Sequence, residues 1–349
     1  MMIIKSFKPF GGHHCITNSL RQIFEYNKFQ ISEQMLFGIG SGLGFVYVNL
    51  ANSPMISCRI KPLELEQNIS NRLKISIKPK TPTNYEKAFK TLIEQISLQN
   101  PVMIYVDMCY LKYMNLDENN HFGGHSIVVF GYDDNEKCFY VSDRDSIDWQ
   151  IQTPKGKIAS DFHKVSYSEM EKARNSSHRP FPANNKWVKF DFSCAKPIDN
   201  ANIFKSIQIN IESMLNPPAN LLGINGIRKF AKEIKKWKSF TTEKKKLAGI
   251  TNYFMINADG GTGGGAFRNL YGNFLIEIAD ITKNKDFANV GNNYLQIGYL
   301  WEQIATEMIN LYNSANDLII DKLPSLIIEI ADKEENELKR LQTMINKYN

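Results

Sequence analysis

The sequence predicts an α+β protein whose C-terminal part is mostly helical. Two β-rich runs, residues 125–132 and 138–143, are joined by a polar turn, which is typical of an antiparallel hairpin. From about Phe192 such runs disappear, and long segments with the apolar spacing of helices follow. Because 349 residues are many for a single core, we expect two domains, residues 1–195 and 196–349.

The N-terminal part alternates short helical and strand-like segments. Apolar residues recur every three or four positions in the expected helices, whereas β-branched and aromatic residues gather in the expected strands. Alternate glycines in residues 38–45 follow a helix, so we interpret them as a loop with close backbone approach rather than as a nucleotide-binding turn. The expected elements are helices over 15–26, from 33 toward 37 and over 85–99, and strands over 102–107, 125–132 and 138–143.

The C-terminal part consists of long periodic segments separated by turn residues. A glycine run over residues 260–265 is one of these interruptions. We expect this part to form a helical domain or a large helical cap. The expected helices cover 203–215, 221–238, 267–282, 292–312 and 315–347.

The composition argues against several classes of protein. No apolar run is long enough to cross a membrane, and the first residues are too short an apolar stretch for a signal peptide, so we expect a cytoplasmic protein. Five irregularly spaced cysteines favour reduced thiols and give no zinc signature, so we expect neither metal nor cofactor. The net charge is +6, and the basic run over 228–246 is typical of a solvated helix face or of a surface for an acidic partner. No recognised motif for nucleic acid accompanies this charge.

Cys15 carries the clearest chemical signal. It ends the sequence GGHHC at the expected first turn of a helix, where the helix dipole favours the thiolate that attacks acyl groups. Cysteine catalysis also needs a base and a third group that orients the base. A hairpin turn centred near residues 134–135 sets His125 opposite Asp143 to within about one residue. We therefore expect Cys15 as nucleophile, His125 as base and Asp143 as the orienting carboxylate.

Other residues compete for these roles, and the sequence leaves the choice open. The competing bases are His13, His14 and His121, and the competing carboxylates are Asp145 and Asp148.

The oxyanion of an acyl-transfer intermediate needs hydrogen-bond donors near the nucleophile. The backbone N–H of Cys15 is the first candidate. The side chain of His14, Asn18 or Gln22 is a candidate for the second donor, since no glutamine precedes the cysteine within the GGHH run.

The glycine run opens an expected helix, and exposed N–H groups at a helix start can hold a phosphate or a carboxylate. Gly263, Gly264, Gly265 and Arg268 are therefore candidate contacts for a substrate anion. A flexible link or a tight packing turn is the alternative.

A cysteine at a helix start, then a histidine on one strand and an aspartate on the next, is the arrangement of papain-like folds. Three functions are compatible with it: an acyltransferase, a peptidase or amidase that hydrolyses an amide, and a binding module without catalysis. An activated thiolate would react faster than the other cysteines, which separates the two enzymes from the binding module.

Several motifs carry a resemblance to a known family. Residues 12–21 (GHHCITNSLR), 31–45 (ISEQMLFGIGSGLGF) and 124–126 (GHS) resemble the N-terminal domain of the butirosin biosynthesis protein H family. Residues 261–271 (GTGGGAFRNLY) resemble the domain of uncharacterised role that often follows it.

The resemblance implies a cysteine-dependent acyltransferase with a papain-like core that acts in secondary-metabolite biosynthesis. Such an enzyme moves an acyl group from the thioester of an acyl carrier protein onto a small-molecule amine. Cys15 would carry the acyl group, and His125 would deprotonate the amine. The glycine run and Arg268 would then contact the donor, and the basic run over 228–246 would suit an acidic carrier protein.

Overall fold

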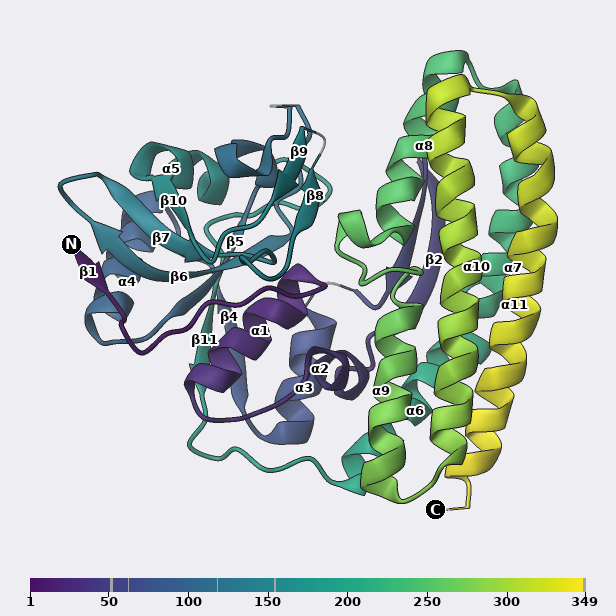
Figure 1. Ribbon diagram of the computed structural model, residues 1–349, viewed down its shortest axis with the longest axis horizontal. Coiled ribbons are helices and arrows are strands. Elements are labelled where there is room, and N and C mark those ends of the chain that lie inside the picture. The colour runs from purple at the N-terminus through teal and green to yellow at the C-terminus, as the bar shows by residue number, and fades with distance from the viewer. Residues whose placement is uncertain (51–52, 62, 118, 154, 348–349) are drawn as a thin grey trace. The chain divides into compact units, whose positions relative to one another are not determined.

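The computed structural model describes residues 1–50, 53–61, 63–117, 119–153 and 155–347. The chain divides into two compact units, residues 1–36 with 73–196, and residues 37–72 with 197–349 (Figure 1). Residues 37–72 thus cluster with residues 197–349, whereas the expected first domain, residues 1–195, includes them.

An antiparallel sheet forms the centre of the first unit. Its order among the described residues is β10-β7-β6-β5-β11-β4, and the short β1 pairs with β6. A separate small hairpin pairs β8 (Ile151–Thr153) with β9 (Gly156–Ile158). The strands of the main sheet are β1 (Met2–Ile3), β4 (Ser76–Lys80), β5 (Val102–Val106), β6 (His125–Asp133), β7 (Cys138–Ser142), β10 (His163–Ser166) and β11 (Trp187–Asp191).

Helices cover the middle of this sheet. α1 (Cys15–Tyr26) packs on β5 and β6 and buries its apolar stripe. α4 (Tyr85–Ser97) packs on β5 and β6, and α5 (Tyr167–Asn175) packs on β5 and β7. All five residues of β5 are buried, which requires cover on both faces of the sheet. The helices expected over 15–26 and 85–99, and the strands expected from 102, 125 and 138, are all present.

The β6–β7 hairpin differs in register from the one we expected. A bulge between Val129 and Gly131 shifts the pairing, and continuing it past the end of β7 sets Asp143 opposite Ile127, not opposite His125. The slip is two residues, so both side chains stay on one face of the sheet, since side chains alternate with a period of two. His125 is therefore the diagonal neighbour of Asp143, a separation that long side chains can span.

The second unit consists of helices packed with a two-stranded hairpin (Figure 1). The hairpin pairs β2 (Leu43–Leu50) with β3 (Ser53–Arg59), and it contacts α7 and α8. α2 (Glu33–Ile39) and α3 (Glu64–Leu73) each contain a boundary between the units. The other helices are α6 (Asn200–Leu215), α7 (Gly223–Glu233), α8 (Thr242–Ile256), α9 (Arg268–Thr282), α10 (Asp286–Ser314) and α11 (Asp317–Ile345).

The alternate glycines of residues 38–45 predict a loop, whereas the structure has the first strand of the β2–β3 hairpin beginning at Leu43. A Cβ atom added at Gly44 would lie 2.8 Å from the carbonyl carbon of Arg59, on the paired strand. The glycine therefore does allow a close backbone approach, but it does so within a strand.

Together the two units confirm the α+β class, with an antiparallel sheet in the N-terminal part and helices in the C-terminal part. Within the described ranges, no helix is both long and apolar enough to cross a membrane.

Candidate active site

Cys15 is the first residue of α1, as the sequence predicts. His14 is the N-cap, but its side chain makes no capping hydrogen bond. The buried carboxylate of Glu33 caps the turn instead: it accepts from the N–H of His13 at 2.8 Å, the N–H of His14 at 2.7 Å and the Thr17 hydroxyl at 2.7 Å. This carboxylate ties the start of α1 to the start of α2 and so fixes the backbone that carries the thiol.

His125 begins β6 and faces the carboxylate of Asp143, which follows β7. Its Nε2 lies 2.8 Å from Oδ2 of Asp143, and both side chains are buried. The thiol of Cys15 interacts with the same imidazole, which lowers the pKa of Cys15 and raises that of His125. Because Asp143 occupies Nε2, Nδ1 is the nitrogen left for the sulfur. A thiol, an imidazole and a carboxylate are thus joined in the order that cysteine catalysis requires.

The groups around Cys15 favour a thiolate paired with an imidazolium. Burial alone would raise the pKa of Cys15, but His125, the N–H of Ser126 and the charge of Arg144 together lower it. Burial also opposes a charged His125, yet Asp143 and the sulfur outweigh it and raise the pKa of His125 to about 10. Despite its own burial, Asp143 has a pKa lowered to about 2 by His125.

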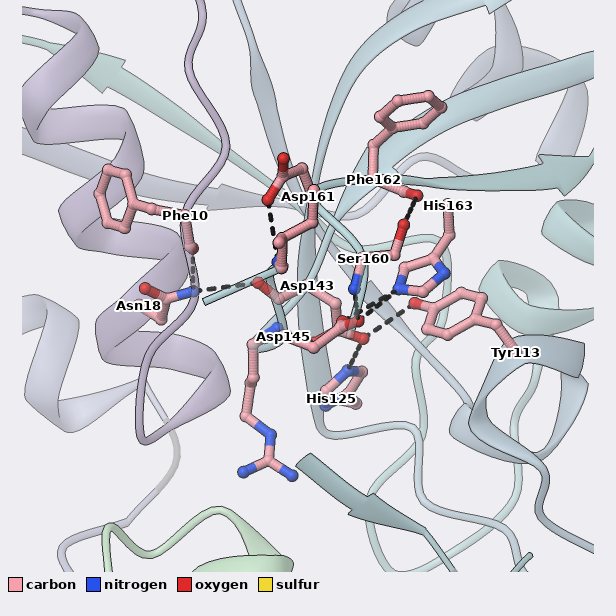
Figure 2. A network of polar contacts seen from close by, with 12 residues as sticks. Phe10, Asn18, Tyr113, His125, Asp143, Asp145, Ser160, Asp161, Phe162 and His163 are labelled. Atoms are coloured by element: carbon pink, nitrogen blue, oxygen red, sulfur yellow. Dashed lines mark hydrogen bonds and ion pairs between the residues drawn. The ribbon is translucent and has the colours of Figure 1, made fainter. Parts of the chain in front are cut away.

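Asp143 is held in place from several sides (Figure 2). The Tyr113 hydroxyl donates to its Oδ2 at 2.8 Å, and the backbone N–H of Arg144 donates to its Oδ1 at 2.7 Å. The side-chain amide of Asn18 donates to the carbonyl of Asp143 at 3.0 Å and to the carbonyl of Phe10 at 3.2 Å. Asn18 therefore links α1 to the end of β7, and this link fixes the position of the Cys15 thiol relative to the Asp143 carboxylate.

A second histidine and carboxylate pair lies beside the first (Figure 2). Nε2 of His163 lies 2.9 Å and 3.0 Å from the two carboxylate oxygens of Asp145. The His163 ring stacks on Tyr113 with a centroid distance of 3.8 Å. Since Tyr113 reaches Asp143, this second pair braces the carboxylate through the tyrosine.

The residues that competed for the base and carboxylate roles have other neighbours. His13 packs edge-on against Trp149, His14 meets the Thr17 hydroxyl at 3.3 Å, His121 pairs with Asp107, Asp145 pairs with His163, and Asp148 is exposed.

The candidate oxyanion donors differ in what they already bind. The amide of Asn18 donates to two backbone carbonyls, which favours a positioning role. Gln22 is buried, and its amide has no hydrogen-bond partner among the described residues. However, it lies seven residues after Cys15, roughly 10 Å along the helix axis, which is too far to reach the acyl carbon. The backbone N–H of Cys15, next to the groups that Glu33 caps, remains the first candidate.

The glycine run has a structural place within the second unit. Residues 263–265 have φ values of 71°, 84° and 56°, and the N–H of Gly265 donates to Glu302 at 2.5 Å. Arg268 begins α9 and is fully buried, with hydrogen bonds of 2.8 Å and 2.9 Å to the carboxylate of Glu334. These contacts favour the packing turn over an anion site, because the arginine is enclosed and already paired.

Several cations of the basic run also have partners within the second unit. The ion pairs are Arg228 with Asp332 and Glu335, Lys236 with Glu233, Lys238 with Asp321, and Lys245 with Asp317. Lys229, Lys232 and Lys235 are exposed.

Four residues of this site are not predicted from the sequence: Glu33, Tyr113, Arg144 and His163. Arg144 adjoins the candidate carboxylate in the sequence, so its charge was the one signal available. The other three reach the site only through tertiary structure.

Two family descriptions match the chain. Residues 14–144 match the family described as Butirosin biosynthesis protein H, N-terminal, and residues 168–341 match the one described as Domain of unknown function (DUF4872). No curated protein matches. The first match includes Cys15, His125 and Asp143, and the second includes α6 to α10 and most of α11.

Proposed function

Because the chain belongs to the butirosin biosynthesis protein H family through its N-terminal domain, we propose that it is a cysteine-dependent acyltransferase. The family match indicates a role in acyl transfer. The specific reaction we propose moves an acyl group from the thioester of an acyl carrier protein, or a similar donor, through Cys15 onto the amine of a small molecule in secondary-metabolite biosynthesis.

In the first step the thiolate of Cys15 attacks the carbonyl carbon of the thioester. A carbon–sulfur bond forms to Cys15, and the carbon–sulfur bond to the donor breaks. The departing thiolate takes a proton from the imidazolium of His125. The products are acyl-Cys15, the free thiol of the donor and a neutral His125.

In the second step an amine attacks acyl-Cys15, and the neutral imidazole takes its proton. The bond to Cys15 breaks, the amide leaves, and the thiolate and imidazolium are restored. The N–H of Cys15 stabilises the oxyanion of both steps. The charge of Arg144 lowers the pKa of Cys15 and so favours the thiolate that each cycle restores.

The observation that carries this proposal is the buried His125 and Asp143 pair next to a thiol whose pKa is lowered. A thiolate that persists at neutral pH can attack a thioester without a separate deprotonation step.

Intact-mass measurement with a panel of acyl thioesters tests the proposal. We expect the wild type and Cys194→Ala, which removes an exposed thiol, to gain one acyl group. Cys15→Ala should gain none. Adding amines to the acylated protein should then release an amide and restore the original mass.

Two other outcomes would replace the proposal. Release of the free acid at the same rate with or without amines would indicate a peptidase or amidase. No adduct with any donor, and alkylation of Cys15 no faster than that of Cys194, would indicate a binding module.

The proposed carrier-protein partner has its own test. Exchanging Lys229, Lys232 and Lys235 for Glu should raise KM for a carrier-bound donor and leave KM for a small-thiol thioester unchanged, because only the carrier would contact this surface. An unchanged KM for both donors would exclude this surface as the docking site.

A further inference from the structure

A second group of cysteine, histidine and aspartate lies in the first unit. Asp107 follows β5, Cys109 lies in the short helix Met108–Tyr110, and His121 lies in the connection before β6. Sγ of Cys109 is 3.2 Å from Nδ1 of His121 and 3.5 Å from Oδ1 of Asp107. The same Nδ1 is 2.9 Å from Oδ2 of Asp107.

The geometry of this group differs from that of a catalytic triad. In a triad, one imidazole nitrogen faces the nucleophile and the other faces the carboxylate, as in His125. In His121 a single nitrogen faces both the sulfur and the carboxylate. Three possible ligand atoms therefore converge on one point, and they lie within 4.8 Å of one another.

The separations between these atoms are close to those around a tetrahedral metal ion. Zinc bonds of about 2.0–2.3 Å place neighbouring ligand atoms roughly 3.3–3.8 Å apart. Nδ1 of His121 lies 3.2 Å from Sγ of Cys109 and 2.9 Å from Oδ2 of Asp107, and Sγ lies 3.5 Å from the other carboxylate oxygen, Oδ1. One ligand atom from each residue lies within 4.8 Å of the other two, so small side-chain movements would admit the ion. A thiolate with an imidazole and a carboxylate suits zinc and related borderline metals, whereas magnesium and calcium prefer oxygen ligands alone.

Neighbouring groups hold these side chains in place. Asp107 is fully buried, and it accepts from the Ser176 hydroxyl at 2.6 Å and from the N–H of Phe122 at 2.8 Å. The ring of His178 stacks on His121 with a centroid distance of 3.4 Å. Partners of this kind orient metal ligands in known sites.

We propose that Asp107, Cys109 and His121 bind one divalent cation of the zinc class, with water in the fourth position. Binding releases the thiol proton of Cys109 to solvent, and the neutral imidazole of His121 keeps its proton on Nε2. The side chain of His121 is partly exposed, so solvent reaches this residue. The spacing of these residues matches no zinc signature, so the sequence predicts no metal here. This inference does not depend on the proposed acyl transfer.

The site lies on the opposite face of the sheet from Cys15. Val106 pairs directly with His125, so these two side chains share a face, and Asp107 is one residue further along an extended backbone. A cation at Asp107 would clamp both ends of the β5–β6 connection, which also carries Tyr113.

Cobalt spectroscopy on the full-length, chelator-treated protein tests the proposal. We expect one Co²⁺ per chain, with the charge-transfer band of a thiolate ligand and the strong visible bands of a tetrahedral site. Zn²⁺ should displace it. Cys109→Ser should lose the charge-transfer band and bind Zn²⁺ roughly 100-fold or more weakly, since outer-shell changes alone cost 10–100-fold.

Cys15→Ser is the matched control, because it removes the thiol of the other cysteine, histidine and aspartate group. It should keep the full cobalt spectrum. A wild type without the thiolate band, or a band lost in Cys15→Ser and kept in Cys109→Ser, would overturn the proposal.

Labelling provides a measurement that does not require a variant to fold. In the wild type, Zn²⁺ should slow the alkylation of Cys109 at concentrations where Mg²⁺ has no effect. Equal rates of Cys109 alkylation with and without Zn²⁺ would overturn the proposal, because they would show that the three side chains form hydrogen bonds and bind no zinc.

Discussion

Replacing Asp143 by Asn tests whether this carboxylate sets the charges of Cys15 and His125. The substitution keeps the shape of the side chain and removes a negative charge 2.8 Å from Nε2 of His125. In the wild type the pKa of His125 is raised from 6.5 to about 10. That difference corresponds to a preference of up to about 5 kcal/mol for the charged ring.

Without Asp143, burial opposes the charge, so His125 should become largely neutral at pH 7 and Cys15 should lose its cation. The pKa of Cys15 then returns toward that of a free cysteine, about 8.5, at which about 3% of the thiol is ionised at pH 7. We expect the wild-type thiol to be largely ionised there, so the variant holds about 30-fold less thiolate. Because a more basic thiolate is also more nucleophilic, the expected loss in alkylation rate at pH 7 is roughly 5–30-fold.

The assay is the rate of iodoacetamide labelling of Cys15, followed by peptide mass from about pH 5 to pH 9. In Asp143→Asn the inflection of this rate should move to higher pH. Asp145→Asn is the matched control, since it removes a buried carboxylate two residues away that pairs with His163 instead. Equal rates for Asp143→Asn and the wild type at pH 7, or an equal upward movement in Asp145→Asn, would refute the reasoning.

Three further substitutions probe the surroundings of the site and the second unit. Tyr113→Phe removes one hydrogen bond to Asp143 and keeps the stacked ring, so kcat should fall about 2–10-fold with KM unchanged; a change confined to KM would contradict this. Glu33→Ala leaves three donors without their acceptor and should lower the free energy of unfolding by about 2–4 kcal/mol in urea titration, and a loss below about 0.5 kcal/mol would argue against the cap. Arg268→Ala should lower the free energy of unfolding by about 3–5 kcal/mol in the same titration, because it leaves the buried carboxylate of Glu334 without its cation. The affinity of the folded variant for the acyl donor should stay unchanged. A selective loss of donor affinity would restore the anion-site interpretation of the glycine run.

The elements that the sequence predicts well are those whose signal is local. α1 carries its apolar stripe within twelve residues, and α10 and α11 repeat the helical spacing over many turns. The β2–β3 hairpin is not predicted, because the need for a glycine at position 44 is evident only from the paired strand, which approaches it closely. α8 is not predicted, because the lysines of its first turns obscure the apolar spacing that marks a buried helix face.

The candidate site divides in the same way. Cys15 at a helix start and His125 at a strand start are local features. Asp143 is predicted through hairpin register, and the observed register differs from the expected one by two residues, which leaves both side chains on one face. Glu33 reaches the start of α1 across 19 and 20 residues of chain, so local periodicity alone does not reveal its capping role.

The β5–β6 connection links the two cysteine, histidine and aspartate groups. It carries Cys109 and His121 toward Asp107 on one face of the sheet, and it carries Tyr113 to Asp143. A cation bound by Asp107, Cys109 and His121 would therefore stiffen the backbone that positions the carboxylate of Asp143. It would not neutralise the thiolate of Cys15, because the two thiols lie on opposite faces of the sheet. Zinc that protects Cys109 should thus leave the pH inflection of Cys15 labelling in place and affect only how firmly Tyr113 holds Asp143.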